Sequence, residues 1–140
     1  MAEPSIWHDE GLDILDEDEC LRLLSTVPVG RVGVCAGALP AIMPVNFELL
    51  GRSIVFRTGD GTKFDAAVRR QVVAFQADHY DERSQTGWSV LAIGPAEDLT
   101  DSIDLITTDN TPRPWAGGER HHYVTVNADF LSGRRINNHT

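Results

Sequence analysis

The chain has 140 residues, a formal net charge of −9 and two cysteines. This length fits one domain that can bury a core without disulfides or a metal. No apolar run is long enough to span a membrane and no basic-then-apolar leader is visible, so we expect a cytoplasmic protein with no membrane partner. The acidic balance and the lack of a basic stripe exclude nucleic acid as a partner.

The chain begins with an acidic segment. Residues 1–30 hold eight acidic side chains and one arginine, a balance that is typical of a solvated surface. We expect residues 1–15 to form an irregular N-terminal arm. Asp16, followed three residues later by Glu19, resembles the capping pair that opens a helix. Pro28 should end that helix.

Alternating apolar residues predict that most of the remaining chain is β-strand. The expected strands are 30–36, 39–50, 52–58, 71–79, 87–99 and 120–126. A short helix is expected over 62–70, with Thr62 and Asp65 as its cap, and a helical turn over 102–107. The first three strands are joined too closely for parallel crossovers, so they form an antiparallel meander. Six such strands should curl into a small barrel with helices over its openings.

The fold class is therefore mainly β, a single barrel domain over residues 16–136. The arm of residues 1–15 precedes it, and a C-terminal tail, residues 137–140, follows. Cys20 lies on the inner face of the first helix and Cys35 in an apolar strand. We expect both to be reduced, buried thiols and not a disulfide.

Residues 57–63 (RTGDGTK) follow one predicted strand and open the second helix. Lys63 is the only lysine in the chain. A helix N-terminus presents free backbone N–H groups and a partial positive charge. Lys63 and Arg57 would add cations there, and the hydroxyls of Thr58 and Thr62 would add donors, which together suit a phosphate. The alternative is a polar turn that binds nothing.

The second strand contains Pro44-Val45-Asn46. Pro44 has no N–H and cannot complete a central ladder, so the sheet should open or have an edge there. Exposed backbone groups and the Asn46 amide could then read the edge of a planar heterocycle. This segment should lie about 10–15 Å from the RTGDGTK turn, which suits a mononucleotide. The alternative is an ordinary strand with a proline bulge.

Five runs carry a family resemblance: LRLLSTVPVGRVGV, LPAIMPVNF, SIVFRTGDGTKFDAAV, VVAFQAD and TGWSVLAIGPAEDL. Together they resemble the pyridoxamine 5′-phosphate oxidase-like flavin-binding split-barrel families, and most of all small actinobacterial-type members that include flavin- and deazaflavin-dependent reductases. The likeness covers about residues 16–136. It implies a six-stranded antiparallel split β-barrel with a few short flanking helices. It also implies a homodimer with the cofactor bound in the dimer cleft.

The resemblance assigns cofactor contacts to nine residues. They comprise phosphate ligands (Arg57, Thr58, Thr62, Lys63), backbone access (Gly61), ring neighbours (Pro44, Val45, Asn46) and an aromatic from this or the partner subunit (Trp88). Ser84 and Gln85 are further candidates for polar contacts. Trp88 could instead be a core aromatic. Asp60 departs from the family pattern, because a carboxylate pointing into the turn would repel a phosphate.

Other chemistry has less support in the sequence. His121 and His122 are neighbours on a predicted strand and point to opposite faces, which disfavours a shared metal. No nucleophile elbow is present, so hydrolysis is not expected. An axial haem ligand could come from His79, His121 or His122, although haem is not the cofactor we expect.

These features predict an oxidoreductase that uses FMN, or the deazaflavin F420, to move hydride or electrons to a small organic acceptor. The cofactor would supply the chemistry, so we assign no catalytic residue. One alternative is a non-catalytic flavin, F420 or haem carrier or sensor on the same dimeric barrel. Another is a barrel without cofactor that serves as a dimeric interaction domain.

Overall fold

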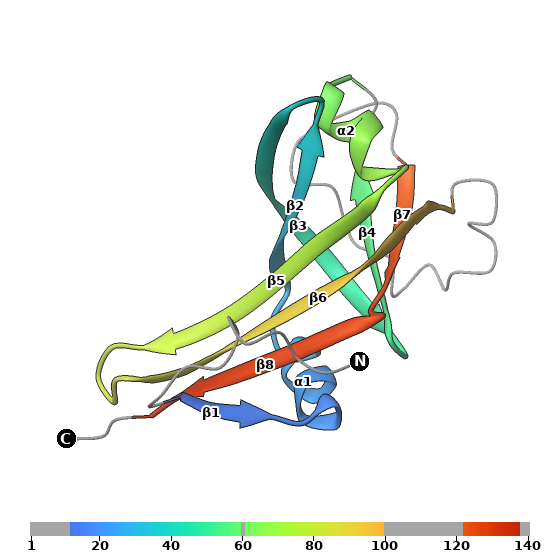
Figure 1. The fold of residues 1–140 in the computed structure, drawn as a ribbon. Helices are drawn as coiled ribbons and strands as arrows, with labels where there is room; N and C mark the ends of the chain where they lie inside the picture. Colours follow the sequence, from blue (N-terminus) through green and yellow to red (C-terminus); the bar gives the residue numbers. More distant parts are fainter. Residues whose placement is uncertain (1–11, 60, 100–121, 138–140) are drawn as a thin grey trace.

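The structure, a computed structural model, describes residues 12–59, 61–99 and 122–137. These ranges contain two helices and eight strands (Figure 1), in the order β1 (Leu12–Leu15), α1 (Glu17–Leu24), β2 (Val29–Ala36), β3 (Leu39–Leu50), β4 (Ser53–Thr58), α2 (Lys63–Val68), β5 (Val72–Asp81), β6 (Thr86–Asp98), β7 (His122–Asn127) and β8 (Phe130–Ile136). Neither helix is long and apolar enough to cross a membrane.

Six of the strands close into an antiparallel barrel. Hydrogen-bonded neighbours follow the order β6–β5–β2–β3–β4–β7, and β7 pairs back onto β6 to complete the ring. β8 extends the sheet from β6, and β1 pairs with β8 at its margin. The six-stranded antiparallel barrel expected from the sequence is confirmed. β5 and β6 stay paired along their length and project as a hairpin beyond the barrel (Figure 1).

One edge of β6 is shared between two partners. It pairs with β8 along Gly87–Ile93 and with β7 along Ala96–Asp98. Gly94 lies at the change of partner, where a Cβ would be only 1.6 Å from the backbone oxygen of Asn127. Only glycine allows the chain between β7 and β8 to pass this close. This crossing point joins the closed barrel to the extension of the sheet formed by β8 and β1.

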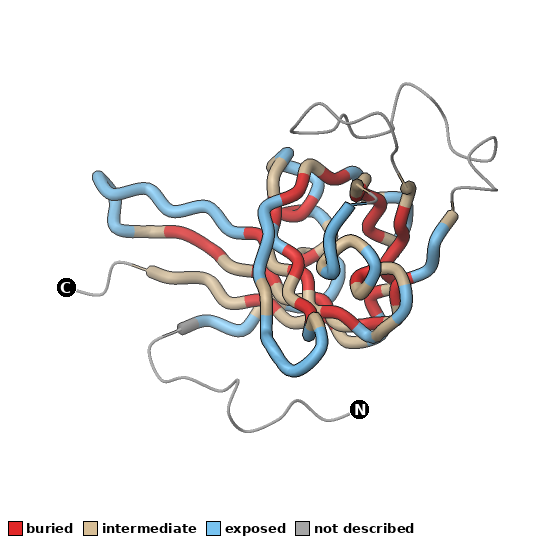
Figure 2. The backbone as a smooth tube through the Cα atoms, turned by 90° about the horizontal axis from the view of Figure 1, so that it is seen from above, coloured by how far each residue is buried: buried red, intermediate tan, exposed pale blue. Residues whose placement is uncertain are grey.

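The hydrophobic core fills the barrel, and one helix packs near each end. Phe47 and Phe75 meet edge-on inside, with ring centroids 4.7 Å apart. Cys20 and Leu24 of α1 pack near β6 and β8, while Val68 of α2 packs toward β2, and all three are fully buried. Figure 2 shows the buried residues gathered inside the barrel and exposed residues at the hairpin tip. Burial of these apolar groups is the main stabilising contribution to the fold.

The predicted capping pair of α1 is confirmed. The backbone N–H of Glu19 donates to a carboxylate oxygen of Asp16 over 2.8 Å. α1 ends at Leu24, four residues before Pro28. The proline therefore follows the helix and is not the residue that terminates it.

Two strands were not expected. Leu12–Leu15, assigned to an irregular arm, forms β1, and Phe130–Ile136, placed inside the barrel domain but given no strand, forms β8. The β8 sequence, FLSGRRI, has a glycine and two arginines, which conceal the strand pattern. Gly133 is needed because α1 packs directly on it: a Cβ there would be 2.6 Å from the Cys20 sulfur. β1 then pairs with β8, so both strands depend on tertiary contacts.

The expectation for the cysteines is half correct. Both are free, and Cys20 is fully buried. Burial raises the pKa of the Cys20 thiol to about 11, so the thiol stays protonated at neutral pH. Cys35 is exposed, contrary to the prediction. It shares the outer face of β2 with Arg31, whereas Val32 and Val34 face the core.

Candidate functional site

The predicted cap of α2 is confirmed as a capping box. The backbone N–H of Asp65 donates to the Thr62 hydroxyl over 3.0 Å, and the Asp65 carboxylate accepts from the Thr62 N–H and hydroxyl over 3.2 and 2.9 Å. This box satisfies helix donors and fixes the entry of the chain into α2. The Thr62 hydroxyl therefore already donates to Asp65, and the Asp65 carboxylate lies beside the turn.

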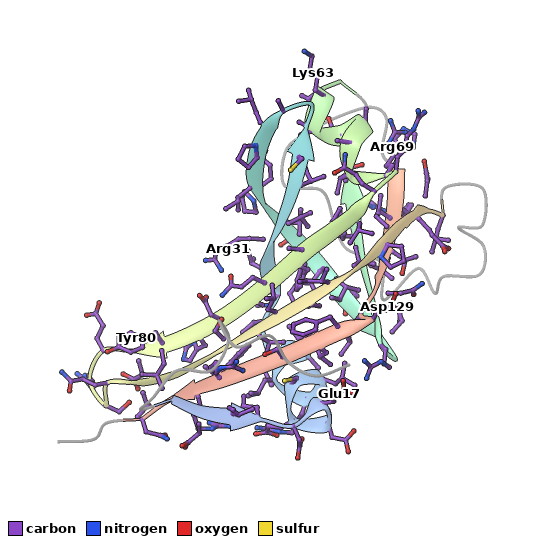
Figure 3. The ribbon with its side chains drawn as sticks, viewed as in Figure 1. Glu17, Arg31, Lys63, Arg69, Tyr80 and Asp129 are labelled. Carbon is purple, nitrogen blue, oxygen red and sulfur yellow. The ribbon has the colours of Figure 1, made fainter. Side chains whose placement is uncertain are left out.

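Lys63 is the first residue of α2, and its side chain is exposed. Figure 3 shows it extending away from the barrel at the α2 end of the molecule. The backbone at Gly61 is open as well, since no atom beyond its two chain neighbours lies within 4 Å of the place where a Cβ would be. The turn therefore offers an accessible cation and accessible backbone to a ligand arriving from solvent.

Arg57 and Thr58 are consecutive residues of β4, so their side chains leave opposite faces of the strand. Arg57 lies opposite Tyr123 on β7. Its guanidinium donates to the Tyr123 hydroxyl and lies 4.6 Å from the centre of that ring. Thr58 points to the other face and is only 7% exposed. Tyr123, which sequence analysis missed, positions Arg57.

Two donor atoms in this strand are buried without a hydrogen-bond partner among the residues that the structure describes. They are Nε of Arg57 and the hydroxyl oxygen of Thr58. An unsatisfied buried polar group costs about 1–3 kcal/mol, so such groups are uncommon in native proteins. Donors left over beside an open, lysine-bearing turn fit a site for an anionic group.

The strand that contains Pro44 has an edge at this residue, one of the two arrangements expected from the sequence. β3 pairs with β2 along Leu39–Asn46, but its ladder with β4 covers Phe47–Leu50. Pro44 is exposed and Asn46 half-buried, so both can contact a ligand at the opening. The side chain of Val45 is only 6% exposed and belongs to the core. Val45 can therefore contribute through its backbone.

The β5–β6 hairpin holds the remaining candidates away from the turn. Trp88 is 7% exposed and packs in the core, which favours the interpretation as a core aromatic. His79, its cross-strand neighbour on β5, is exposed. Ser84 and Gln85 lie exposed in the connecting turn, where Gln85 has a φ of 56°. The structure of a single subunit thus does not bring these residues to α2.

A second cluster, absent from the sequence analysis, lies beside α2. Arg69, Asp98 and His122 come together from α2's C-cap, the end of β6 and the start of β7. The three residues are far apart in the chain, so no local motif could reveal them. His122 also pairs across the ladder with Thr58, so this cluster adjoins the buried hydroxyl.

Two residues weighed in the sequence analysis, Asp60 and His121, lie outside the described residues. Asp65 is the carboxylate that the structure does show beside the turn: its Oδ2 is 3.3 Å from where a Gly59 Cβ would lie. Within ranges 12–59, 61–99 and 122–137, no three His, Cys, Asp or Glu residues are grouped so as to hold a metal ion.

A shallow pocket of about 150 Å³ lies far from these groups, between β1, α1 and β8. Glu17 and Asp129 line it, and Figure 3 shows both at the opposite end of the molecule from Lys63. Two carboxylates disfavour an anionic ligand. The candidate site is therefore the α2 end of the barrel and not this pocket.

Comparison with known proteins places these elements in a family context. The family model described as pyridoxamine 5′-phosphate oxidase matches residues 16–135. The uncharacterized protein Rv0080 of Mycobacterium tuberculosis is 36% identical over 127 residues, which span 87% of this chain and 84% of that protein. All the candidate residues named above for the cofactor fall within the family match.

Solved structures of similar fold and sequence agree with this family match. An FAD-binding protein from Mycobacterium smegmatis has a TM-score of 0.75 and 35% identity, with 88% of this chain and 98% of the other covered. A Corynebacterium diphtheriae protein of unknown function, DIP1874, has a TM-score of 0.73 and 28% identity, with 91% and 99% covered. The likeness to both solved structures thus extends over most of this chain and nearly all of each neighbour.

Proposed function

Because this chain belongs to the pyridoxamine 5′-phosphate oxidase family, we propose that it is a flavin-dependent oxidoreductase with FMN as its cofactor. The phosphate would bind at the turn between β4 and α2, and the isoalloxazine ring would lie beside Pro44, Val45 and Asn46. The electron acceptor would be a small organic molecule. Two free thiols are compatible with a reducing compartment, and we propose the cytoplasm.

The unpartnered donors on β4 carry this proposal. Nε of Arg57 and the Thr58 hydroxyl are buried and unsatisfied in the described part of the chain. They adjoin a turn whose lysine and Gly61 backbone are open. Phosphate oxygens accept hydrogen bonds from a guanidinium such as that of Arg57, and charge-assisted bonds are the stronger ones. Thr58 leaves the opposite face of β4, so Arg57 is the donor on this strand that we assign to the phosphate. Arg57, steadied by Tyr123, would supply charge without moving when the ligand binds.

The chemistry would come from the cofactor. A bound flavin supplies hydride or electron transfer to the acceptor. The chain would contribute orientation: the backbone of β3 at its opening would fix the ring edge, and the cations of the turn would fix the phosphate. No side chain is assigned as an acid or base.

More than one flavin or deazaflavin cofactor is consistent with the family resemblance. The Mycobacterium smegmatis relative is named for FAD, and the actinobacterial-type resemblance also suggests F420. FMN and FAD share the riboflavin ring and its first phosphate, so the turn could serve either. We propose FMN because Arg57 at the end of β4 and Lys63 at the start of α2 flank one turn, which suits one terminal phosphate.

The visible absorption spectrum of the purified protein tests this function. We expect the bands of an oxidised flavin, and chromatography of the material released on denaturation should identify it as FMN. Release of FAD or F420 would correct the cofactor and keep the flavin function. A Soret band, or a colourless protein that binds none of the three when they are added, would contradict the proposal.

We further propose a homodimer in which the partner completes the cofactor cleft. Ile42 and Val72 are 72% and 62% exposed, and Ile42 adjoins Gly33 and Ala74 in a row of small residues across β2 and β5. Large apolar side chains exposed on the outer face of a sheet indicate a protein contact.

The mass in solution tests the dimer. Sedimentation equilibrium should give twice the chain mass of 15.4 kDa. Ile42→Asp should shift the equilibrium to single chains, because it buries a charge at the contact. Leu50→Asp, at the exposed last residue of β3, is the matched control and should remain dimeric. A parent protein with the mass of one chain would refute the dimer.

A further inference from the structure

Arg69 joins α2 to the ends of two barrel strands. Its Nε–H donates to the backbone carbonyl of Asp65 over 3.0 Å. A terminal nitrogen lies 2.9 Å from Nε2 of His122 and 3.5 Å from the Asp98 carboxylate. Nδ1 of His122 lies 3.1 Å from the same carboxylate oxygen. The same Arg69 nitrogen also lies 3.1 Å from Nδ1. If Nδ1 carries the proton and donates to Asp98, Nε2 is the ring nitrogen that accepts from Arg69.

The cluster is enclosed enough for these contacts to fix positions. The side chain of Arg69 is 14% exposed, that of His122 20% and that of Asp98 33%. A guanidinium this buried needs its charge balanced, and the Asp98 carboxylate does so. The planar group donates from several nitrogens in a fixed geometry. Moving α2 away from β6 and β7 would therefore break several contacts at once.

A continuous set of contacts connects Arg69 to the turn. Arg69 holds the Asp65 carbonyl, and the Asp65 carboxylate holds the N–H and hydroxyl of Thr62. Thr62 directly precedes Lys63. α2 has six residues and one buried residue, Val68. A helix so short is not stable by itself, so its position depends on contacts such as those of Arg69.

We propose that Arg69, anchored by Asp98 and His122, is a positioning residue that holds α2 and the preceding turn in place for a ligand phosphate. This inference rests on the proposed function, because it assigns the residue a role at the same site. Arg69 itself need not touch the ligand. Its contribution should appear only with ligands that carry the phosphate.

FMN and riboflavin separate this role from a general structural one, because riboflavin lacks the phosphate. Arg69→Ala should weaken FMN binding by about tenfold or more, because the turn loses the anchor that the charge-assisted contact of Arg69 with Asp98 provides. The affinity for riboflavin should change by less than about twofold, which is the usual variation when a mutation does not affect the ligand's contacts. The matched control is Arg70→Ala, which removes an exposed arginine one residue further on and should alter neither affinity. Arg69→Lys should restore part of the FMN affinity, because it keeps the charge beside Asp98.

Each result is decisive. If the parent protein binds FMN no better than riboflavin, the phosphate site itself, and not the positioning role, has failed. If the parent prefers FMN and Arg69→Ala keeps the whole preference, or lowers both affinities equally, the positioning role is wrong. If Arg69→Ala fails to fold, Asp98→Asn replaces it in the test, because it keeps the side-chain shape and removes the charge. The measurement is again the ratio of FMN affinity to riboflavin affinity, compared with that of the parent protein.

Discussion

Replacing Lys63 with alanine should weaken FMN binding by about 1.5–3 kcal/mol, the contribution of a charge-assisted contact to a phosphate. Lys63 is the only lysine in the chain and begins α2 at the open turn. Its exposed side chain makes no contribution to the core, so the folded protein should be unaffected. Fluorescence titration with FMN measures the loss, and thermal unfolding verifies the fold.

Two comparisons sharpen this test. Lys63→Arg keeps the positive charge and should retain most of the FMN affinity. Riboflavin, which has no phosphate, should bind the parent and Lys63→Ala equally well. Unchanged FMN affinity in Lys63→Ala would remove this residue from the site.

The second large effect is expected at Gly94. A Cβ at this position would lie 1.6 Å from the Asn127 backbone oxygen and 2.8 Å from the adjoining carbonyl carbon. Backbone atoms on both sides are fixed by the ladders of β6 with β5, β7 and β8. Gly94→Ala should therefore reduce the free energy of unfolding by at least about 3 kcal/mol.

Gly33→Ala is the matched control for that variant, because it makes the same change within a barrel strand. A Cβ at Gly33 would meet its nearest neighbour, the Cβ of Ala74, at an ordinary 3.9 Å. Denaturant unfolding should thus show a loss below about 1 kcal/mol for Gly33→Ala. Equal losses for the two variants would show that the crossing at Gly94 is not a tight constraint.

The barrel could be predicted because its strands show the required pattern locally. β3 has the expected bounds Leu39–Leu50, and β4 and β5 differ from expectation by one or two residues. Apolar alternation and short glycine-containing connections encode these strands and their antiparallel order. β8 could not be found this way. Its pairing with β6 and the close packing of α1 on Gly133 supply the stability that its own residues lack.

The candidate site also has parts that the sequence predicts and parts that it does not. The turn before α2, its capping box and the opening of β3 at Pro44 follow from residues that are neighbours in the chain. Tyr123 and the cluster of Arg69, Asp98 and His122 depend on which strands the barrel makes adjacent, so a single sequence does not reveal them. The opposite directions of Arg57 and Thr58 follow from strand geometry. They show that phosphate contacts predicted as one group leave β4 on two faces.

Equilibrium titration of the ligand-free protein with FMN, FAD and F420 tests the central claim most directly. Binding of FMN at micromolar or lower concentration, with riboflavin clearly weaker, is the result that the arrangement of β3, β4 and α2 predicts. Failure of all three cofactors to bind in the micromolar range would contradict a flavin site in this barrel.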